Sequence, residues 1–191
     1  CLAGVFSLED ALMLIANRGK MMQALPGGAM LSVKSSADEI EKRLSGKLTI
    51  ASINSPTLCV VAGPNNEVES LASQLESEGI ACRHLHTSHA FHSSMMDPLV
   101  EPYRKLVSSI ELSAPRLPIL STVTGEWMTD DEATDPRYWA EHMRAPVQFS
   151  DAVKKLWTDY PNRILIELGP RKTLVSLAMQ HKALFKDEVN V

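Results

Sequence analysis

The stretch LTIASINSPTLCVVA, from Leu48 to Ala62, holds two apolar runs on either side of a Ser-Pro pair. Apolar and β-branched residues favour strands, and serine and proline are common in turns. The stretch therefore predicts two strands, Leu48 to Asn54 and Leu58 to Ala62, which follow one another with only a short turn between them.

Further strand and helix patterns flank this pair on both sides. They predict a strand at Ala29 to Val33, a helix from Ser36 to about Leu44, an amphipathic helix at Glu67 to Glu78 and a strand at Ala81 to Thr87. The resulting order is strand, helix, strand, strand, helix, strand. This order is typical of the split βαβ, or ferredoxin-like, unit.

Outside this unit, helical spacing alternates with short apolar runs. It predicts helices from Leu8 to about Met22, Met96 to Ile110, Tyr138 to Met143, within Pro146 to Tyr160, and Thr173 to Met179, and strands at Leu117 to Val123 and Ile164 to Leu168. Strands that alternate with helices favour a parallel α/β sheet. We therefore expect an α/β protein in which the ferredoxin-like unit is an insertion.

Composition narrows the function classes. The 191 residues are 45% hydrophobic and carry a net charge of −4, which favours a packed core and argues against nucleic acid as the main partner. No apolar stretch approaches the roughly 20 residues that span a bilayer. The three cysteines are far apart, which favours a reducing cytosol and a cytoplasmic protein.

Four of the six histidines lie between His84 and His92. They could form a metal site, supply a catalytic base or belong to a polar surface loop. His84 and His86 share one face of a predicted strand, where exposure to water accounts for them well. His89 and His92 lie at a strand-to-helix junction, and ligands of α/β sheets bind at the carboxyl ends of strands.

Several short motifs, taken together, point to one family. They are His89-Ala90-Phe91-His92 (HAFH), Arg18 to Gln23 (RGxxMQ), Ala51 to Pro56 (AxxNxP), Pro146 to Phe149 (PVxF) and Glu167 to Pro170 (ExGP). In this order and spacing they resemble the acyltransferase domains of modular polyketide synthases, relatives of malonyl-CoA:acyl carrier protein transacylase. Ala3 to Leu12 resembles the helix after that family's nucleophile elbow. The resemblance covers essentially the whole chain.

The resemblance implies a two-step acyl transfer in polyketide biosynthesis. A serine in a GHSxG elbow takes the malonyl group from malonyl-CoA and passes it to the phosphopantetheine thiol of an acyl carrier protein. It implies no bound cofactor or metal, and it implies neighbouring polyketide synthase domains in the same polypeptide, with no nucleic acid or membrane as partner. The implied fold is a partial parallel-sheet, α/β-hydrolase-like large subdomain (1–27 and 89–191) with a ferredoxin-like small subdomain (28–88).

By the same resemblance, His92 is the general base and Arg18 binds the free carboxylate of malonyl. A guanidinium suits this task because it holds a carboxylate through two hydrogen bonds. Phe91 would limit the space for an α-methyl group and so favour malonyl. His142 is a weaker candidate for orienting His92, because relatives there rely on a main-chain carbonyl near the second ring nitrogen.

The sequence also departs from the family. It contains no GHSxG, and it begins at Cys1 in an apolar run, which we interpret as the inside of a larger polypeptide. We therefore expect the chain alone to be inactive. Two alternatives stay open: a non-enzymatic ferredoxin-like binding module and a metal-binding protein built on the histidine cluster.

Overall fold

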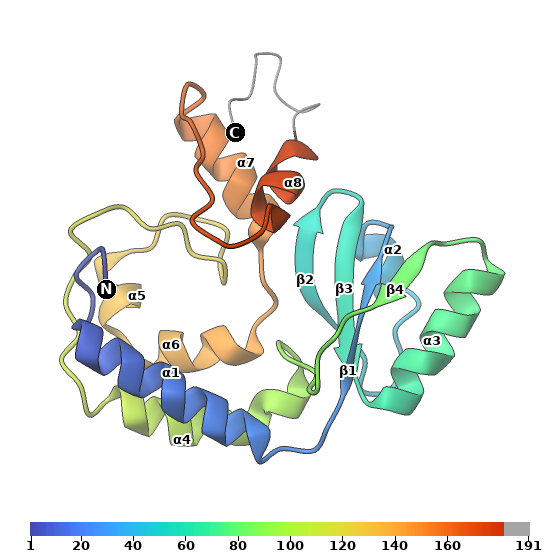
Figure 1. Cartoon of the computed structure of the whole chain (residues 1–191), viewed down its shortest axis with the longest axis horizontal. Coiled ribbons are helices and arrows are strands. Elements are labelled where there is room, and N and C mark those ends of the chain that lie inside the picture. The colour runs from blue at the N-terminus through green and yellow to red at the C-terminus, as the bar shows by residue number, and fades with distance from the viewer. Residues whose placement is uncertain (182–191) are drawn as a thin grey trace.

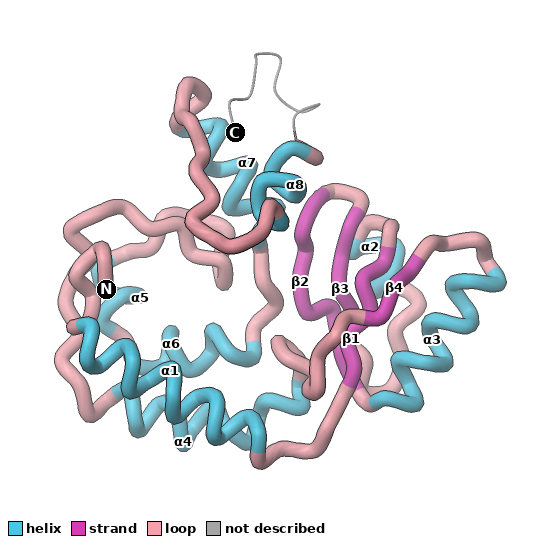
Figure 2. Tube along the Cα trace, in the orientation of Figure 1, coloured by secondary structure: helices cyan, strands magenta, loops and turns pink. Residues whose placement is uncertain are grey.

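The computed structural model describes residues 1–181, and one four-stranded sheet lies in that part of the chain (Figures 1 and 2). Its strands are β1 (Ala29–Val33), β2 (Thr49–Ser55), β3 (Leu58–Gly63) and β4 (Cys82–His84), in the order β2-β3-β1-β4. All three neighbouring pairs are antiparallel. Together with α2 (Ala37–Glu41) and α3 (Asn65–Ser77), the strands have the predicted ferredoxin-like order.

The two faces of the sheet pack against different parts of the chain. Helices α2 and α3 cover one face, where Leu31 and Val33 of β1 are fully buried (Figure 1). Met30 points to the opposite face, because successive strand residues alternate. There the sheet contacts Ala90 and Phe91. The histidine-rich segment therefore lies against the sheet face that the two helices leave open.

A helical layer lies beside the sheet (Figure 1). Its members are α1 (Leu8–Gln23), the short 3₁₀ helix η1 (Ser94–Met96), α4 (Asp97–Val107), α5 (Asp130–Thr134) and α6 (Pro136–Arg144). Leu14 and Met22 of α1 enter a shared core with Leu99 of α4 and Met143 of α6. Within residues 1–181, no helix is both long and apolar enough to span a membrane.

A third group contains α7 (Phe149–Asp159) and α8 (Thr173–Met179), which pack through Val153, Trp157 and Ala178. The segment before α7 joins this group to the sheet. Val147 N–H donates to the Ala51 carbonyl at 2.9 Å, and Ile53 N–H donates to the Val147 carbonyl at 2.8 Å. The edge strand β2 thus holds the chain between α6 and α7.

The predicted parallel sheet is absent from residues 1–181, and this part of the prediction is wrong for them. Leu120 makes only an isolated bridge with Trp127, and 164–168 forms no strand. A strand needs a neighbour that pairs with its N–H and C=O groups, and no described segment pairs with 164–168. Ile164, Ile166 and Leu168 are instead 69%, 76% and 90% exposed.

Candidate active site

Helix α1 presents Arg18 to the helical core. Ser7 caps the helix by accepting a hydrogen bond from Asp10 N–H. Arg18 follows the buried Leu14 by four residues, so both lie on the same helix face, and Arg18 is half-buried. No acidic side chain within residues 1–181 pairs with Arg18. Its guanidinium is therefore available to an anionic ligand.

His92 occupies a strained turn between the sheet and η1. Its φ of 57° lies in the left-handed region, and no other non-glycine residue of the described chain has a positive φ. Such conformations are uncommon and concentrate at functional sites. The buried Ser93 holds the turn, since its hydroxyl donates to the Ala90 carbonyl at 2.7 Å and accepts from Met95 N–H at 3.2 Å.

One ring nitrogen of His92 is fixed by the backbone. Nδ1 lies 2.9 Å from the Ala145 carbonyl oxygen, directly after α6. A carbonyl only accepts, so Nδ1 carries the hydrogen and donates it. Nε2 is then the basic nitrogen, and no group within residues 1–181 bonds to it. When the ring is neutral, this geometry leaves Nε2 as a free acceptor.

The surroundings favour the neutral form of this imidazole. Burial lowers the pKa of His92, the hydrogen bond to Ala145 opposes this effect, and the nearby positive charge of Arg18 lowers the pKa further. The charge of Arg18 also acts on Tyr103 and His142. Arg18, His92 and His142, which the sequence separates widely, are therefore neighbours in the fold.

His142 lies beside His92 with a ring-centroid distance of 6.4 Å and an interplanar angle of 74°. Burial, Arg18 and His92 lower the pKa of His142 to about 4. Its Nε2 is 3.5 Å from the Thr122 hydroxyl. The carbonyl that holds His92 belongs to Ala145, three residues beyond His142.

Phe91 packs between two cores. It contacts the helical core of α1, α4 and α6 and also the open face of the sheet. Its ring centroid lies 6.1 Å from that of His89. The sequence places Phe91 next to His92, and the structure adds that it lies where the sheet and the helical layer meet.

The remaining histidines form no metal centre in the described chain. His84 lies 3.3 Å from Glu69 on the surface, and His86 is exposed. Among residues 1–181, no group of three or more His, Cys, Asp or Glu is arranged to hold a metal ion. The metal-protein alternative gains no support from this part of the chain.

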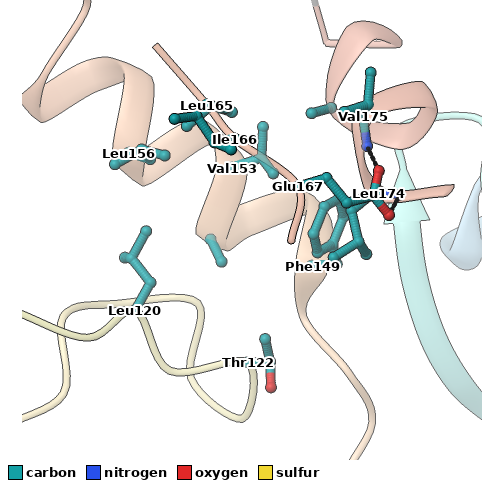
Figure 3. Close-up of a pocket in the computed structure, with 12 residues that line it drawn as sticks. Leu120, Thr122, Phe149, Val153, Leu156, Leu165, Ile166, Glu167, Leu174 and Val175 are labelled. Carbon is teal, nitrogen blue, oxygen red and sulfur yellow. Dashed lines mark hydrogen bonds between the residues drawn. The ribbon is translucent and has the colours of Figure 1, made fainter. Parts of the chain in front are cut away.

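A separate apolar cavity of about 260 Å³ lies between α7, α8 and the segment 164–168 (Figure 3). Its one acidic side chain, Glu167, accepts hydrogen bonds from Leu174 N–H at 3.1 Å and Val175 N–H at 3.0 Å, at the start of α8. None of the four predicted site residues lines it. Thr122 connects the two regions, because it lines the cavity and also lies 3.5 Å from His142 Nε2.

Sequence reasoning missed Ala145, Thr122 and Tyr103. Ala145 acts through its carbonyl, which every residue has, so no residue-type signal marks it. Tyr103 has helical spacing that predicts a core position, and it is indeed buried, so nothing in the pattern marks its nearness to Arg18.

Comparisons with known proteins identify the family of the chain. The family described as "Acyl transferase domain" matches residues 1–189. The chain belongs to this family. A phenolphthiocerol/phthiocerol polyketide synthase protein of Mycobacterium tuberculosis is 37% identical over 180 residues, which is 94% of this chain and 12% of that protein. The relationship places the chain with the acyltransferase domains of modular polyketide synthases.

Solved structures show the same relationship. The acyltransferase domain of SpnD, in complex with 2-(pent-4-yn-1-yl)malonyl, superposes with a TM-score of 0.93 at 35% identity, over 100% of this chain and 46% of that one. Malonyl CoA-acyl carrier protein transacylase from Burkholderia pseudomallei gives a TM-score of 0.86 at 25% identity, over 98% of this chain and 66% of that one. The chain thus spans about half of the SpnD domain and a small part of the mycobacterial synthase.

Proposed function

We propose that this chain supplies the general base and the carboxylate-binding residue of a malonyl transferase. The complete enzyme moves a malonyl group from malonyl-CoA to the phosphopantetheine thiol of an acyl carrier protein in polyketide biosynthesis. The observation that carries the proposal is the arrangement of His92. Its Nδ1 is tied to Ala145 O at 2.9 Å, its Nε2 is free within residues 1–181, and Arg18 lies beside it without an acidic partner.

The proposed base acts in both half-reactions. His92 Nε2 takes the proton of a serine hydroxyl supplied from outside residues 1–191, and the serine oxygen attacks the thioester carbonyl carbon. The carbon–sulfur bond breaks, and His92 returns the proton to the leaving CoA thiolate. In the second half, Nε2 takes the pantetheine thiol proton, sulfur attacks the acyl ester, and the serine oxygen recovers the proton. Such proton transfers contribute about 10²–10⁴-fold to a rate.

Arg18 accounts for the choice of a dicarboxylic acyl group. The free carboxylate of malonyl takes no part in the transfer, and a half-buried guanidinium without an acidic partner would hold it through two charge-assisted hydrogen bonds. The same positive charge lowers the pKa of His92, so it also favours the neutral base. Arg18 thus binds the substrate carboxylate and also favours the deprotonated form of His92.

Phe91 is our candidate for excluding substituents at C2 of the malonyl group. The SpnD relative is solved with a substituted malonyl, so size at this carbon varies within the family. A single methyl group in a pocket is worth about 1–3 kcal/mol, or roughly 10–200-fold in selectivity. We expect Phe91→Ser to raise use of methylmalonyl-CoA relative to malonyl-CoA.

A chimaera tests the proposal directly. Residues 1–191 replace the matching part of the SpnD acyltransferase domain, which supplies the remainder of the fold. With radiolabelled malonyl-CoA we expect a labelled protein that passes its label to a phosphopantetheinylated carrier protein. His92→Ala should lower the labelling rate by about 10²-fold or more. An active chimaera in which His92→Ala retains the parent rate contradicts the assignment of the base.

The isolated chain provides a second test. Because residues 1–191 contain no Gly-x-Ser-x-Gly sequence, we expect no covalent label on them after incubation with radiolabelled malonyl-CoA and denaturing electrophoresis. A stable labelled band would show that the chain carries its own nucleophile.

A further inference from the structure

We propose that His89 is a positioning residue that fixes the end of α1, and with it Arg18, relative to the turn that carries His92. The inference rests on the proposed function, since it concerns how the carboxylate-binding residue is held. His89 has no assigned task in the acyl transfer. It is only 5% exposed and so offers little surface to a substrate.

Both ring nitrogens of His89 are used inside the protein. Nε2 lies 3.1 Å from the Leu25 carbonyl oxygen, just beyond α1, and Nδ1 lies 2.8 Å from the Ser88 hydroxyl. The Leu25 carbonyl only accepts, so Nε2 carries the hydrogen and the Ser88 hydroxyl donates to Nδ1. His89 therefore joins two segments that are 64 residues apart in the chain.

Backbone contacts connect the same two segments, 25–28 and 88–90, and we call this contact region the joint. Gly28 N–H donates to the Ser88 carbonyl at 3.2 Å. A Cβ atom on Gly28 would lie 2.8 Å from Ala90 Cβ, which is closer than Cβ atoms normally approach. The segment that follows α1 and the segment that leads to His92 are thus in direct contact.

The position of Arg18 depends on this joint. The last turn of α1 continues into Ala24 and Leu25, whose N–H groups donate to Met21 and Met22 carbonyls at 3.2 and 3.1 Å. The link from His89 to Leu25 therefore restrains the helix end directly. A displacement of a positioning group by about 1 Å costs up to about 10²-fold in rate. Loss of the link should affect the substrate that needs Arg18 more than one that does not.

Two matched substitutions separate the two nitrogens. In His89→Gln the amide reaches the place of Nε2 and still donates to Leu25 O. In His89→Asn the shorter amide reaches the place of Nδ1, near Ser88, and loses Leu25. Both replace the ring by a neutral amide, so they lose the ring packing alike. Thermal unfolding of both variants records the structural cost separately.

The assay uses the chimaera with malonyl-CoA and with acetyl-CoA, which lacks the free carboxylate. We expect His89→Asn to lower kcat/KM for malonyl-CoA by about 10-fold, mainly through KM, as expected for one lost hydrogen bond that aligns the clamp. Its use of acetyl-CoA should stay within about 2-fold of the parent, and His89→Gln should keep the parent selectivity. Equal losses with both donors, or no loss in His89→Asn, overturn the inference.

Arg18→Ala distinguishes failure of this inference from failure of the proposed function. If Arg18→Ala leaves the preference for malonyl-CoA intact, the carboxylate clamp itself is wrong, and the inference falls with it. If Arg18→Ala removes the preference while His89→Asn does not, only the inference is wrong. Malonate binding to residues 1–191, followed through the Arg18 side-chain NMR signal, gives the same comparison without the chimaera.

Discussion

His92 combines a strained backbone, a fixed ring nitrogen and a neighbouring cation. Burial is the main cause of its lowered pKa, and Arg18 adds to it, while the bond to Ala145 opposes both. A base with a lowered pKa is deprotonated at neutral pH without a carboxylate partner. The backbone carbonyl thus fixes the tautomer without adding a negative charge near the place proposed for the malonyl carboxylate.

The first prediction concerns this charge coupling. In Arg18→Ala the pKa of His92 should rise, because the lowering by the guanidinium is removed while burial stays. NMR of the imidazole nitrogens of residues 1–191 across pH 4 to 8 measures this shift. The exposed Arg83 provides a control, and Arg83→Ala should leave the titration of His92 unchanged. An unchanged pKa in Arg18→Ala would show that the two groups are farther apart than the structure places them.

His142 makes the fold sensitive to acid. Its pKa is about 4 in the folded chain against 6.5 for an ordinary histidine, chiefly because it is buried. Between these values the unfolded chain binds a proton that the folded chain does not. Its contribution to folding stability is therefore complete above pH 6.5 and is lost as the pH falls towards 4, by at most about 3 kcal/mol.

We expect His142→Asn to lose less stability than the parent between pH 7 and pH 4.5. Urea unfolding of residues 1–191 at both pH values measures the difference. His86→Asn is the control, because His86 is exposed and its substitution should not alter the acid sensitivity. Equal losses in the parent and in His142→Asn would contradict a buried neutral imidazole at this position.

At the scale of elements, two glycines with different surroundings test the joint between α1 and the sheet. A Cβ on Gly28 would meet Ala90 Cβ at 2.8 Å and the Gly63 carbonyl at 2.9 Å, whereas Gly19 inside α1 has nothing within 4 Å. Gly28→Ala should lower the free energy of unfolding by about 1–3 kcal/mol through overpacking. Gly19→Ala should raise it by about 0.5–1 kcal/mol. Urea unfolding measures both free energies. An unchanged free energy of unfolding in Gly28→Ala would mean that the joint has room for the added Cβ atom.

The elements also show what sequence can determine. The hairpin at 48–62 was predictable because its two apolar runs and its turn residues are adjacent in the chain. The strand expected at 164–168 does not form. An apolar run becomes a strand only where a partner pairs with it, and none does within residues 1–181. The division of the chain at 28 and 88 stays a prediction.

The arrangement of the candidate site likewise depends on partners that are distant in the chain. Arg18 and His92 are 74 residues apart, and at the level of sequence only the resemblance to a family relates them. The strained φ of His92 and the carbonyl of Ala145 have no signal in the sequence, because they are properties of the backbone. The role proposed for His89 likewise depends on a contact with Leu25 that no motif marks.

At the scale of the whole molecule, apolar side chains remain on two surfaces. Leu8, Leu12 and Ile15 form a stripe along α1 with exposures of 67%, 61% and 68%. The second surface is the segment 164–168, whose Ile164, Ile166 and Leu168 are exposed and whose Leu165 and Ile166 line the apolar cavity. The SpnD domain is about twice as long as the part that this chain matches. We propose that the remainder of such a domain covers both surfaces and supplies the strand partner of 164–168.

Residues 1–191 by themselves should therefore associate through the α1 stripe, since contiguous exposed apolar surface drives association. The double substitution Leu12→Glu and Ile15→Glu should hold the chain monomeric at concentrations where the parent assembles, as measured by sedimentation velocity. Ser70→Glu with Ser73→Glu adds the same charge to exposed positions of α3, away from the stripe, and removes no large apolar side chain. If this control suppresses association equally, net charge and not the apolar stripe governs it. If neither pair has an effect, the contact lies elsewhere, and the segment 164–168 is the next surface to alter.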